Sequence, residues 1–397
     1  MVTKRLYMHT AYDWAVFLAI LLYIHTALVF SAIGVAWIEL IKTLDISYTL
    51  LGLISVVGAG LSLVSMLVGG SLISRYGCRK TLLGTIPVLA LSHCALALAP
   101  SQLVLIAANI GWGVGFGALL VATTTVVLDW ERERRKRLID PFQAAWNVAS
   151  ILGAVGAGWA LTIGWNFQHI LLTAAATALP LWLLIAFSKF PTSGIVEEPA
   201  HPFATIGIIA SNRSLAILGI VVIFATFAQN VGQTWSPIYL NTIGASPLIS
   251  GIALASFQAA TALFRFVNGA IVKSVGTRAA LLSGALGMCI AAALLLYSQH
   301  QYVVLAAFVI LGGAVAGAQP TTLAIAVQLM PTRIAVVSSG IMALGEVGFI
   351  MSTPILGWLG DTYSLQQSMA TALPCGLIIM LLLFFLPNIP AHMKSPR

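Results

Sequence analysis

Continuous apolar runs of about twenty residues repeat along the whole chain, and their length constrains the fold more than any motif does. A helix needs roughly 20 such residues to cross the hydrocarbon core of a bilayer. With 59% hydrophobic and only 8% charged residues, the sequence has too little polar surface for a soluble domain. The runs lack the alternation of barrel strands, so we expect helices. The sequence therefore predicts an all-α integral membrane protein with twelve transmembrane helices, near residues 14–38, 48–73, 81–98, 103–127, 141–163, 167–188, 215–236, 249–273, 279–297, 302–328, 334–358 and 370–388.

The longest polar gap between these runs lies in the middle of the chain. It includes Pro191, Glu197, Glu198 and Pro199, a composition typical of a linker. We therefore predict an N-terminal six-helix half at residues 1–188, a linker at 189–214 and a C-terminal six-helix half at 215–397.

The two predicted halves also resemble each other in sequence. Sliding the chain against itself by 199 residues superposes identical residues from the second predicted helix to the fifth, with no gap. Transporters are commonly built from two parallel repeats of this kind. The offset predicts two pseudo-symmetric six-helix halves, and the matched pairs are Gly52/Gly251, Gly70/Gly269, Gly77/Gly276, Arg79/Arg278, Gly113/Gly312, Thr123/Thr322, Arg134/Arg333, Gly158/Gly357 and Trp159/Trp358.

Basic residues predict the orientation of the chain in the membrane. If the N-terminus is cytoplasmic, 17 of the 19 Lys and Arg residues fall on the cytoplasmic side, leaving Lys42 outside and Arg265 within a helix. This asymmetry follows the positive-inside rule. The net charge of +8 is then explained by loops that face anionic lipid, and nucleic-acid binding is not expected. We predict a multi-pass protein of a cell membrane, a bacterial inner membrane, with both termini and the linker in the cytoplasm.

The loop between the second and third predicted helices resembles a known signature. The segment from Gly70 to Lys80 is similar to the helix 2–3 loop of the major facilitator superfamily, and residues 269–278 form a weaker second copy. The acidic residue of that signature is Ser74 here and Lys273 in the second copy. The resemblance covers the whole chain and implies the fold of that superfamily, transport by alternating access, and a gating role for Gly70, Arg75, Gly77, Arg79, Lys80, Gly269, Gly276 and Arg278.

Glycines in the two loops also predict local geometry. Gly77 and Gly276 tolerate positive φ, so we expect a tight turn at each. Gly70 and Gly269 are expected to let helices pack closely near the gate.

Two charges lie inside predicted membrane helices. Arg265 is ~12 Å along its helix from Lys273, and Glu346 is ~20 Å past Arg333, at 1.5 Å per residue. A charge at the centre of a membrane helix costs roughly 2.5–3.5 kcal/mol, so such residues are functional candidates. We predict that Arg265 binds substrate and that Glu346 couples transport to a proton.

Other polar residues recur at helical spacing beside these charges. They are predicted to face one shared central cavity and to bind substrate, although polar contacts between helices would produce the same spacing. The additional substrate-binding candidates are Gln258, Thr261, Asn230, Gln233, Asn147, Gln143, His25 and Gln319.

The segment from Arg265 to Gly269 resembles a helix of monocarboxylate and oxalate/formate transporters within the same superfamily. That resemblance implies that the guanidinium binds a substrate carboxylate. The oxalate type carries a Lys where this chain places Glu346, which disfavours a dianion. We therefore expect symport of a small organic monoanion with a proton. The alternative is a proton-driven exporter of drug-like compounds.

Enzymatic chemistry is not expected. The sequence has no catalytic Ser/His/Asp arrangement, and its four cysteines lack metal-ligand spacing. We expect no cofactor and no metal. The expected partners are a small-molecule substrate, a proton and membrane lipid, with the chain acting as a monomer.

Overall fold

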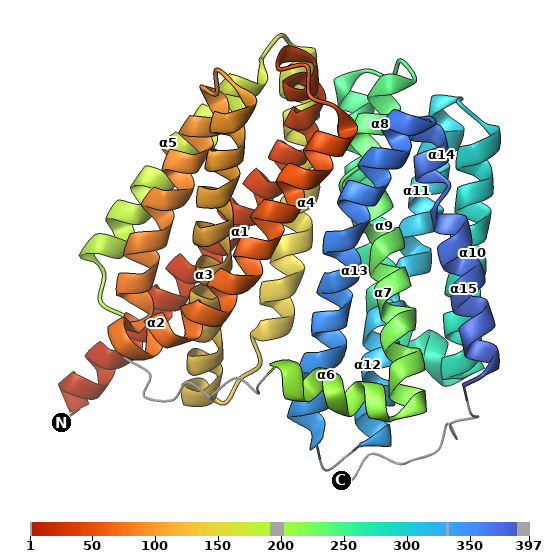
Figure 1. The fold of residues 1–397 in the computed structure, drawn as a ribbon. Helices are drawn as coiled ribbons and strands as arrows, with labels where there is room; N and C mark the ends of the chain where they lie inside the picture. The colour runs from red at the N-terminus through yellow and green to blue at the C-terminus, as the bar shows by residue number, and fades with distance from the viewer. Residues whose placement is uncertain (1, 191–201, 331–332, 387–397) are drawn as a thin grey trace. The chain divides into compact units, whose positions relative to one another are not determined.

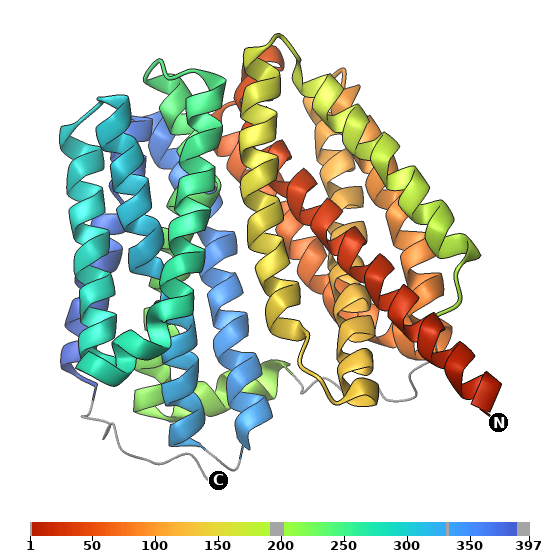
Figure 2. The same cartoon turned by 180° about the vertical axis from the view of Figure 1, so that it is seen from behind.

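The computed structural model describes residues 2–190, 202–330 and 333–386, and within these ranges every regular element is a helix. The chain divides into two compact units, residues 1–198 and 199–397 (Figure 1). Each unit is a bundle of long helices (Figure 2). The first unit consists of α1 (Val2–Thr43), α2 (Tyr48–Ala97), α3 (Gln102–Arg134), α4 (Ile139–Thr162) and α5 (Phe167–Phe187).

The second unit uses more and shorter helices along an equivalent path. In it α9 packs on α11, and α13 packs on α7. Its helices are α6 (Pro202–Ser211), α7 (Arg213–Gln233), α8 (Ser236–Thr242), α9 (Pro247–Val275), α10 (Thr277–Tyr297), α11 (Gln301–Ala316), α12 (Ala318–Leu329), α13 (Ile334–Thr362), α14 (Leu365–Met369) and α15 (Ala372–Phe384).

The predicted membrane helices are present. Among the described residues, 11 helical stretches are long and apolar enough to cross a membrane. One of them, α2, has 50 residues and would be ~75 Å long if straight, against ~30 Å for the hydrocarbon core. It contains two predicted helices, 48–73 and 81–98, joined at Gly77, where φ is 80° and ψ is 159°. The break in α2 accounts for the difference from the predicted twelve.

The predicted linker is only partly described. Its residues 191–201 lie outside the described ranges. Its next part is the helix α6, which packs against α7 and α13 of the second unit, and α7 already begins at Arg213. The end of the predicted linker is therefore regular helix rather than loop.

The repeat of 199 residues extends to individual hydrogen bonds. The N-cap of α2 is Ser47, whose side chain accepts a hydrogen bond from the Leu50 amide. The N-cap of α9 is Ser246, which accepts one from the Ile249 amide in the same way. Left-handed backbone also recurs, with φ of 80° at Gly77 and 86° at Gly276. Glycine adopts this conformation without steric cost, so both predicted tight turns are confirmed.

Glycines bring equivalent helices together in each unit. A Cβ at Gly113 on α3 would overlap the carbonyl oxygen of Gly58 on α2. A Cβ at the counterpart Gly312 on α11 would overlap that of Phe257 on α9. Small residues at these positions allow the close backbone approach that stabilises membrane helix pairs.

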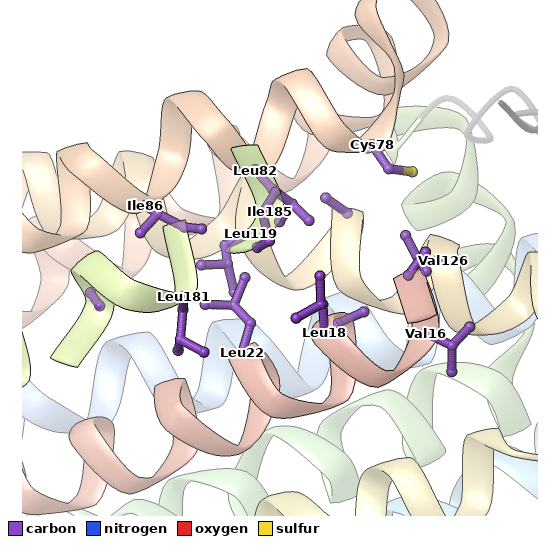
Figure 3. Close-up of a cluster of buried hydrophobic side chains, with 14 of the residues drawn as sticks. Val16, Leu18, Leu22, Cys78, Leu82, Ile86, Leu119, Val126, Leu181 and Ile185 are labelled. Carbon is purple, nitrogen blue, oxygen red and sulfur yellow. The ribbon is translucent and has the colours of Figure 1, made fainter. Parts of the chain in front are cut away.

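The first unit is held together by an apolar cluster shared by four helices. It contains Leu18 and Leu22 of α1, Leu82 of α2, Leu119 of α3 and Ile185 of α5 (Figure 3). These side chains are at most 2% exposed. The cluster fixes the rotation of α1 and α3, and thereby decides which of their other side chains remain accessible.

Candidate functional site

The signature loop of each unit binds the last helix of that same unit. Arg79 donates from Nε to the Ile185 carbonyl at 3.2 Å and from its terminal nitrogen to the Ala186 carbonyl, both near the end of α5. Arg278 donates to the Phe384 carbonyl at the end of α15 at 3.5 Å. Positions 185 and 384 are themselves 199 residues apart. These arginines therefore satisfy helix-end carbonyls, a role that the gating prediction did not include.

The remaining loop residues differ in their surroundings. The guanidinium carbon of Arg75 lies 5.3 Å from the ring centre of Tyr76, a cation–π contact. Lys80 is exposed, and none of the described residues forms a hydrogen bond or ion pair with it. A Cβ at Gly269 would meet nothing within 4 Å. The interpretation that Gly269 allows close helix packing is wrong in this structure, since Gly312 does so instead.

Arg265 lies on α9 with its side chain exposed. No residue that the structure describes forms a hydrogen bond or ion pair with it. Its predicted companions on α9 are buried, with Gln258 6% and Thr261 4% exposed. The Thr261 hydroxyl is near the carbonyls of Phe257 and Gly312, at 2.8 and 3.1 Å. The predicted stripe therefore separates into a threonine that joins α9 to α11 and a guanidinium that remains available.

Glu346 is likewise exposed on α13 and has no hydrogen-bond or ion-pair partner among the described residues. Three helices meet at the preceding residue, Gly345. The hydroxyl of Thr226 on α7 donates to the Gly345 carbonyl at 2.8 Å. The side-chain nitrogen of Gln319 on α12 lies 3.3 Å from where a Gly345 Cβ would be. The fold therefore brings Gln319, a predicted site residue, next to the segment that carries Glu346.

The remaining α7 candidates are occupied by protein contacts. Asn230 is fully buried, and its amide donates to the hydroxyls of Ser352 and Thr353 on α13 at 2.7 Å each. Gln233 accepts from the Gln229 side chain at 3.2 Å. Asn230 thus connects α7 to α13, and we leave it and Thr261 out of the site proposed below.

The first unit contributes two accessible amides and one histidine. Gln143 is exposed and Asn147 is half-buried on α4, where the Asn147 amide lies 3.5 Å from the Gln143 carbonyl. His25 on α1 is hydrogen-bonded to Thr177 on α5, with 2.9 Å between Nε2 and Oγ1. His25 also lines a small internal cavity together with His93.

An aromatic cluster in the first unit was missed from the sequence. Tyr23 stacks on Phe142 with 3.8 Å between ring centres, and Trp112 stacks on Phe116 at 4.6 Å. Trp146 lies 4.8 Å from Tyr23 and 6.2 Å from Phe116. The signal in the sequence was the spacing of four between aromatic residues on α3 and again on α4. We call this set, which joins α1, α3 and α4, the aromatic cluster: Tyr23, Phe30, Trp112, Phe116, Phe142 and Trp146.

Comparison with known families decides the class of protein. The sequence profile described as Major Facilitator Superfamily matches residues 19–346 of this chain. The chain belongs to the Major Facilitator Superfamily. Members of this superfamily are secondary transporters, so the chain is a multi-pass membrane transporter of small molecules and not an enzyme.

The relatives of this superfamily member do not identify its solute. An uncharacterized MFS-type transporter of Yersinia pestis is 25% identical over 313 residues, covering 78% of this chain and 79% of that protein. A multidrug resistance protein, Stp, of Mycobacterium tuberculosis is 26% identical over 167 residues, covering 40% of this chain and 29% of that protein.

A solved structure confirms the fold. The crystal structure of a nucleoside transporter, NupG, gives a TM-score of 0.77 at 11% identity, covering 95% of this chain and 98% of that chain. At this identity the likeness concerns the fold alone. Within the superfamily, the narrower resemblance to monocarboxylate and oxalate/formate transporters rests on the Arg265 motif alone. The shared central cavity stays a prediction.

Proposed function

We propose that this chain carries a small organic monoanion together with a proton across a membrane by alternating access. The single observation that carries the proposal is the accessible guanidinium of Arg265. It lies in a membrane-spanning helix and has no hydrogen-bond or ion-pair partner among the described residues. A charge in such a position is retained at a cost and needs a counter-charge. A planar guanidinium pairs well with a carboxylate, because two parallel hydrogen bonds form.

Glu346 supplies the proton site in this proposal. It is accessible, and none of the described residues provides a cation within 4.0 Å of it. Loss of hydration disfavours an ionised carboxylate. Arg265 opposes that effect while its own charge is unneutralised, and a bound monoanion removes part of the opposition. Substrate and proton would then increase each other's affinity by the same factor, which is the coupling that a symporter needs.

Further polar groups are proposed to contact the substrate. In the second unit they are Gln319, Gln258 and Gln233. In the first unit they are Gln143, Asn147 and His25. The aromatic cluster of the first unit offers a large, partly accessible apolar surface, which favours a substrate with an organic body over an inorganic anion. We propose the MFS monomer as the working unit.

Uptake into proteoliposomes tests the proposal. Vesicles with a neutral interior are diluted into acidic buffer, and accumulation of a panel of radiolabelled monocarboxylates is followed. We expect uphill accumulation of at least one monoanion that collapses with a protonophore, and none of the corresponding dicarboxylate. If no monoanion accumulates in active vesicles, the proposal is wrong.

A second candidate is a proton-driven exporter of drug-like compounds. It is favoured by the aromatic cluster, which suits lipophilic solutes, and by the partial likeness to the multidrug resistance protein Stp. In this case Glu346 would exchange protons for drug, and Arg265 would position it. Proton-driven loss of ethidium from loaded vesicles, with no monoanion uptake, would establish this alternative.

The proposed orientation places both termini and the 189–214 linker in the cytoplasm of a bacterial cell. It rests on the location of 17 of 19 basic residues. A single cysteine introduced at Gly194, in a variant lacking the four native cysteines, should resist a membrane-impermeant maleimide in intact cells. It should react after the membrane is opened, and labelling of intact cells would reverse the orientation.

A further inference from the structure

Each unit contains an apolar groove at the same place in the repeat. In the first unit the groove is lined by α3 and by both arms of α2, the segments before and after Gly77. It has a volume of about 430 Å³. In the second unit it lies among α9, α10 and α11 and has a volume of about 360 Å³. Many lining residues are 199 positions apart, including Leu72 and Ile271, and Ala118 and Gly317. The grooves are therefore counterparts, and their differences are informative.

The two grooves differ at the end next to the signature loop. The groove of the first unit is lined there by Tyr76 and Lys80. The counterpart positions are Val275 and Ala279, and neither lines the groove of the second unit. Arg75 lies beside Tyr76 through its cation–π contact. Of the two grooves, only the first is lined by a cation, Lys80, and Arg75 lies beside its lining residue Tyr76.

Lys80 is free to bind a ligand from this position. Its neighbour Arg79 donates to a carbonyl at the end of α5. Lys80, in contrast, is exposed and has no partner among the described residues. Lys80 follows the Gly77 break that joins two membrane-spanning arms of α2, so it must lie near the membrane surface. The groove is also lined by Val64 and Val68, whose side chains are 53% and 49% exposed. Apolar side chains exposed on a membrane helix favour an acyl chain.

We propose that the groove between the arms of α2 and α3 binds one anionic phospholipid. One acyl chain occupies the apolar groove, and the headgroup phosphate pairs with Lys80 and Arg75 and accepts a hydrogen bond from the Tyr76 hydroxyl. The charge of the site is complementary to a lipid with net negative charge, which separates it from the zwitterionic lipids around it. This site lies within one unit and does not depend on the transported solute.

Native mass spectrometry of the purified, detergent-solubilised protein tests the headgroup part of the proposal. Phosphatidylglycerol and phosphatidylethanolamine with identical oleoyl chains are titrated separately. We expect one tightly bound phosphatidylglycerol and weaker binding of phosphatidylethanolamine. Lys80→Ala should weaken phosphatidylglycerol binding on the order of fivefold. Lys273→Ala, which removes an equal charge outside either groove, should not. Equal losses in the two variants, or equal binding of the two lipids by the wild type, would overturn the proposal.

Two further variants test the acyl-chain part. Gly84 lines the groove, and a Cβ there would meet nothing within 4 Å, so Gly84→Leu should fill the groove without disturbing the fold. Gly156 is equally unobstructed but lies on α4 outside the groove, and Gly156→Leu is the matched control. We expect Gly84→Leu, but not Gly156→Leu, to lose the bound lipid, although Lys80 and Arg75 are present in both variants. Wild-type affinity in Gly84→Leu would overturn the proposal.

Discussion

The two halves of the chain share a backbone plan but carry different chemistry. The first unit has the aromatic cluster, and at the offset of 199 residues three of its members are replaced in the second unit by aliphatic residues or glycine: Leu311 for Trp112, Val315 for Phe116 and Gly345 for Trp146. The second unit carries the accessible charges of Arg265 and Glu346. The first unit has Met66 and Asn147 at the counterpart positions.

What the halves keep in common has a backbone reason. Ser47 and Ser246 cap equivalent helices, and Gly77 and Gly276 adopt the same left-handed turn. The arginines at 79 and 278 both bind carbonyls of the last helix of their unit. These features fix geometry, and the same geometry needs the same residues twice. A small solute is not symmetric, so the groups that would bind it need not repeat.

Removing Arg265 should have the largest effect. Arg265→Ala leaves a substrate carboxylate without its charged partner, which costs roughly 2–5 kcal/mol, so binding should weaken at least about thirtyfold. Arg265→Lys should also impair transport, because a point charge replaces a planar fork. The readout is substrate binding by the purified protein, with Met66→Ala at the counterpart position as the control. Unchanged affinity in Arg265→Ala would make the residue structural and remove the contrast between the halves.

Replacing Glu346 should separate binding from energy coupling. Glu346→Gln imitates the protonated form permanently, so the variant should bind and exchange substrate but lose accumulation driven by a proton gradient. Counterflow and uphill uptake in the same proteoliposomes measure the two properties. Asn147→Ala, at the counterpart position, removes a proposed substrate contact and no proton site, so it should lower counterflow and uphill uptake together. Uphill uptake by Glu346→Gln would transfer the coupling role to another group. The next candidates are His25 and Asp13 of α1, which forms an ion pair with Arg134 at 2.6 Å.

Making the aromatic cluster resemble the other half should have an intermediate effect. Trp112→Leu installs the residue found at the counterpart Leu311. It removes the ring on which we propose that the substrate body stacks, a contact worth about 0.5–1.5 kcal/mol, so KM should rise roughly two- to tenfold. The lost stacking on Phe116 should lower the free energy of unfolding by a similar amount. Trp159→Leu, which changes a 57% exposed tryptophan outside the cluster, should leave KM unchanged. An identical KM in both variants would show that the cluster does not contact substrate.

The arginines that the halves share should affect stability rather than substrate affinity. Arg79→Ala leaves two helix-end carbonyls without their donor, so we expect a loss of about 1–3 kcal/mol and a lower Tm, with KM unchanged. Arg278→Ala should act in the same direction in the second unit. Lys273→Ala is the control, because Lys273 is exposed and makes no such bond among the described residues. A shift in KM without a change in Tm would instead favour the gating role.

The class of this protein and its two-repeat plan could be predicted from the amino-acid sequence. The length of the apolar runs requires helices in a membrane, because lipid leaves backbone groups no other partners. The offset of 199 residues predicted the repeat, and Gly77 and Gly276 predicted two turns. The charges of Arg265 and Glu346 could also be singled out, because a charge within an apolar run is costly wherever its helix packs.

The folded structure was needed to show which polar side chains remain available to a ligand. Helical spacing placed Asn230 and Thr261 beside the two charges, yet both form hydrogen bonds to neighbouring helices. The hydrogen bonds of Arg79 and the contacts of the aromatic cluster likewise became visible only in the folded chain. Their partners lie far away along the chain, and contact depends on helix rotation. That rotation is set by packing such as the apolar cluster of the first unit and the close approach at Gly113, which a one-dimensional pattern does not contain.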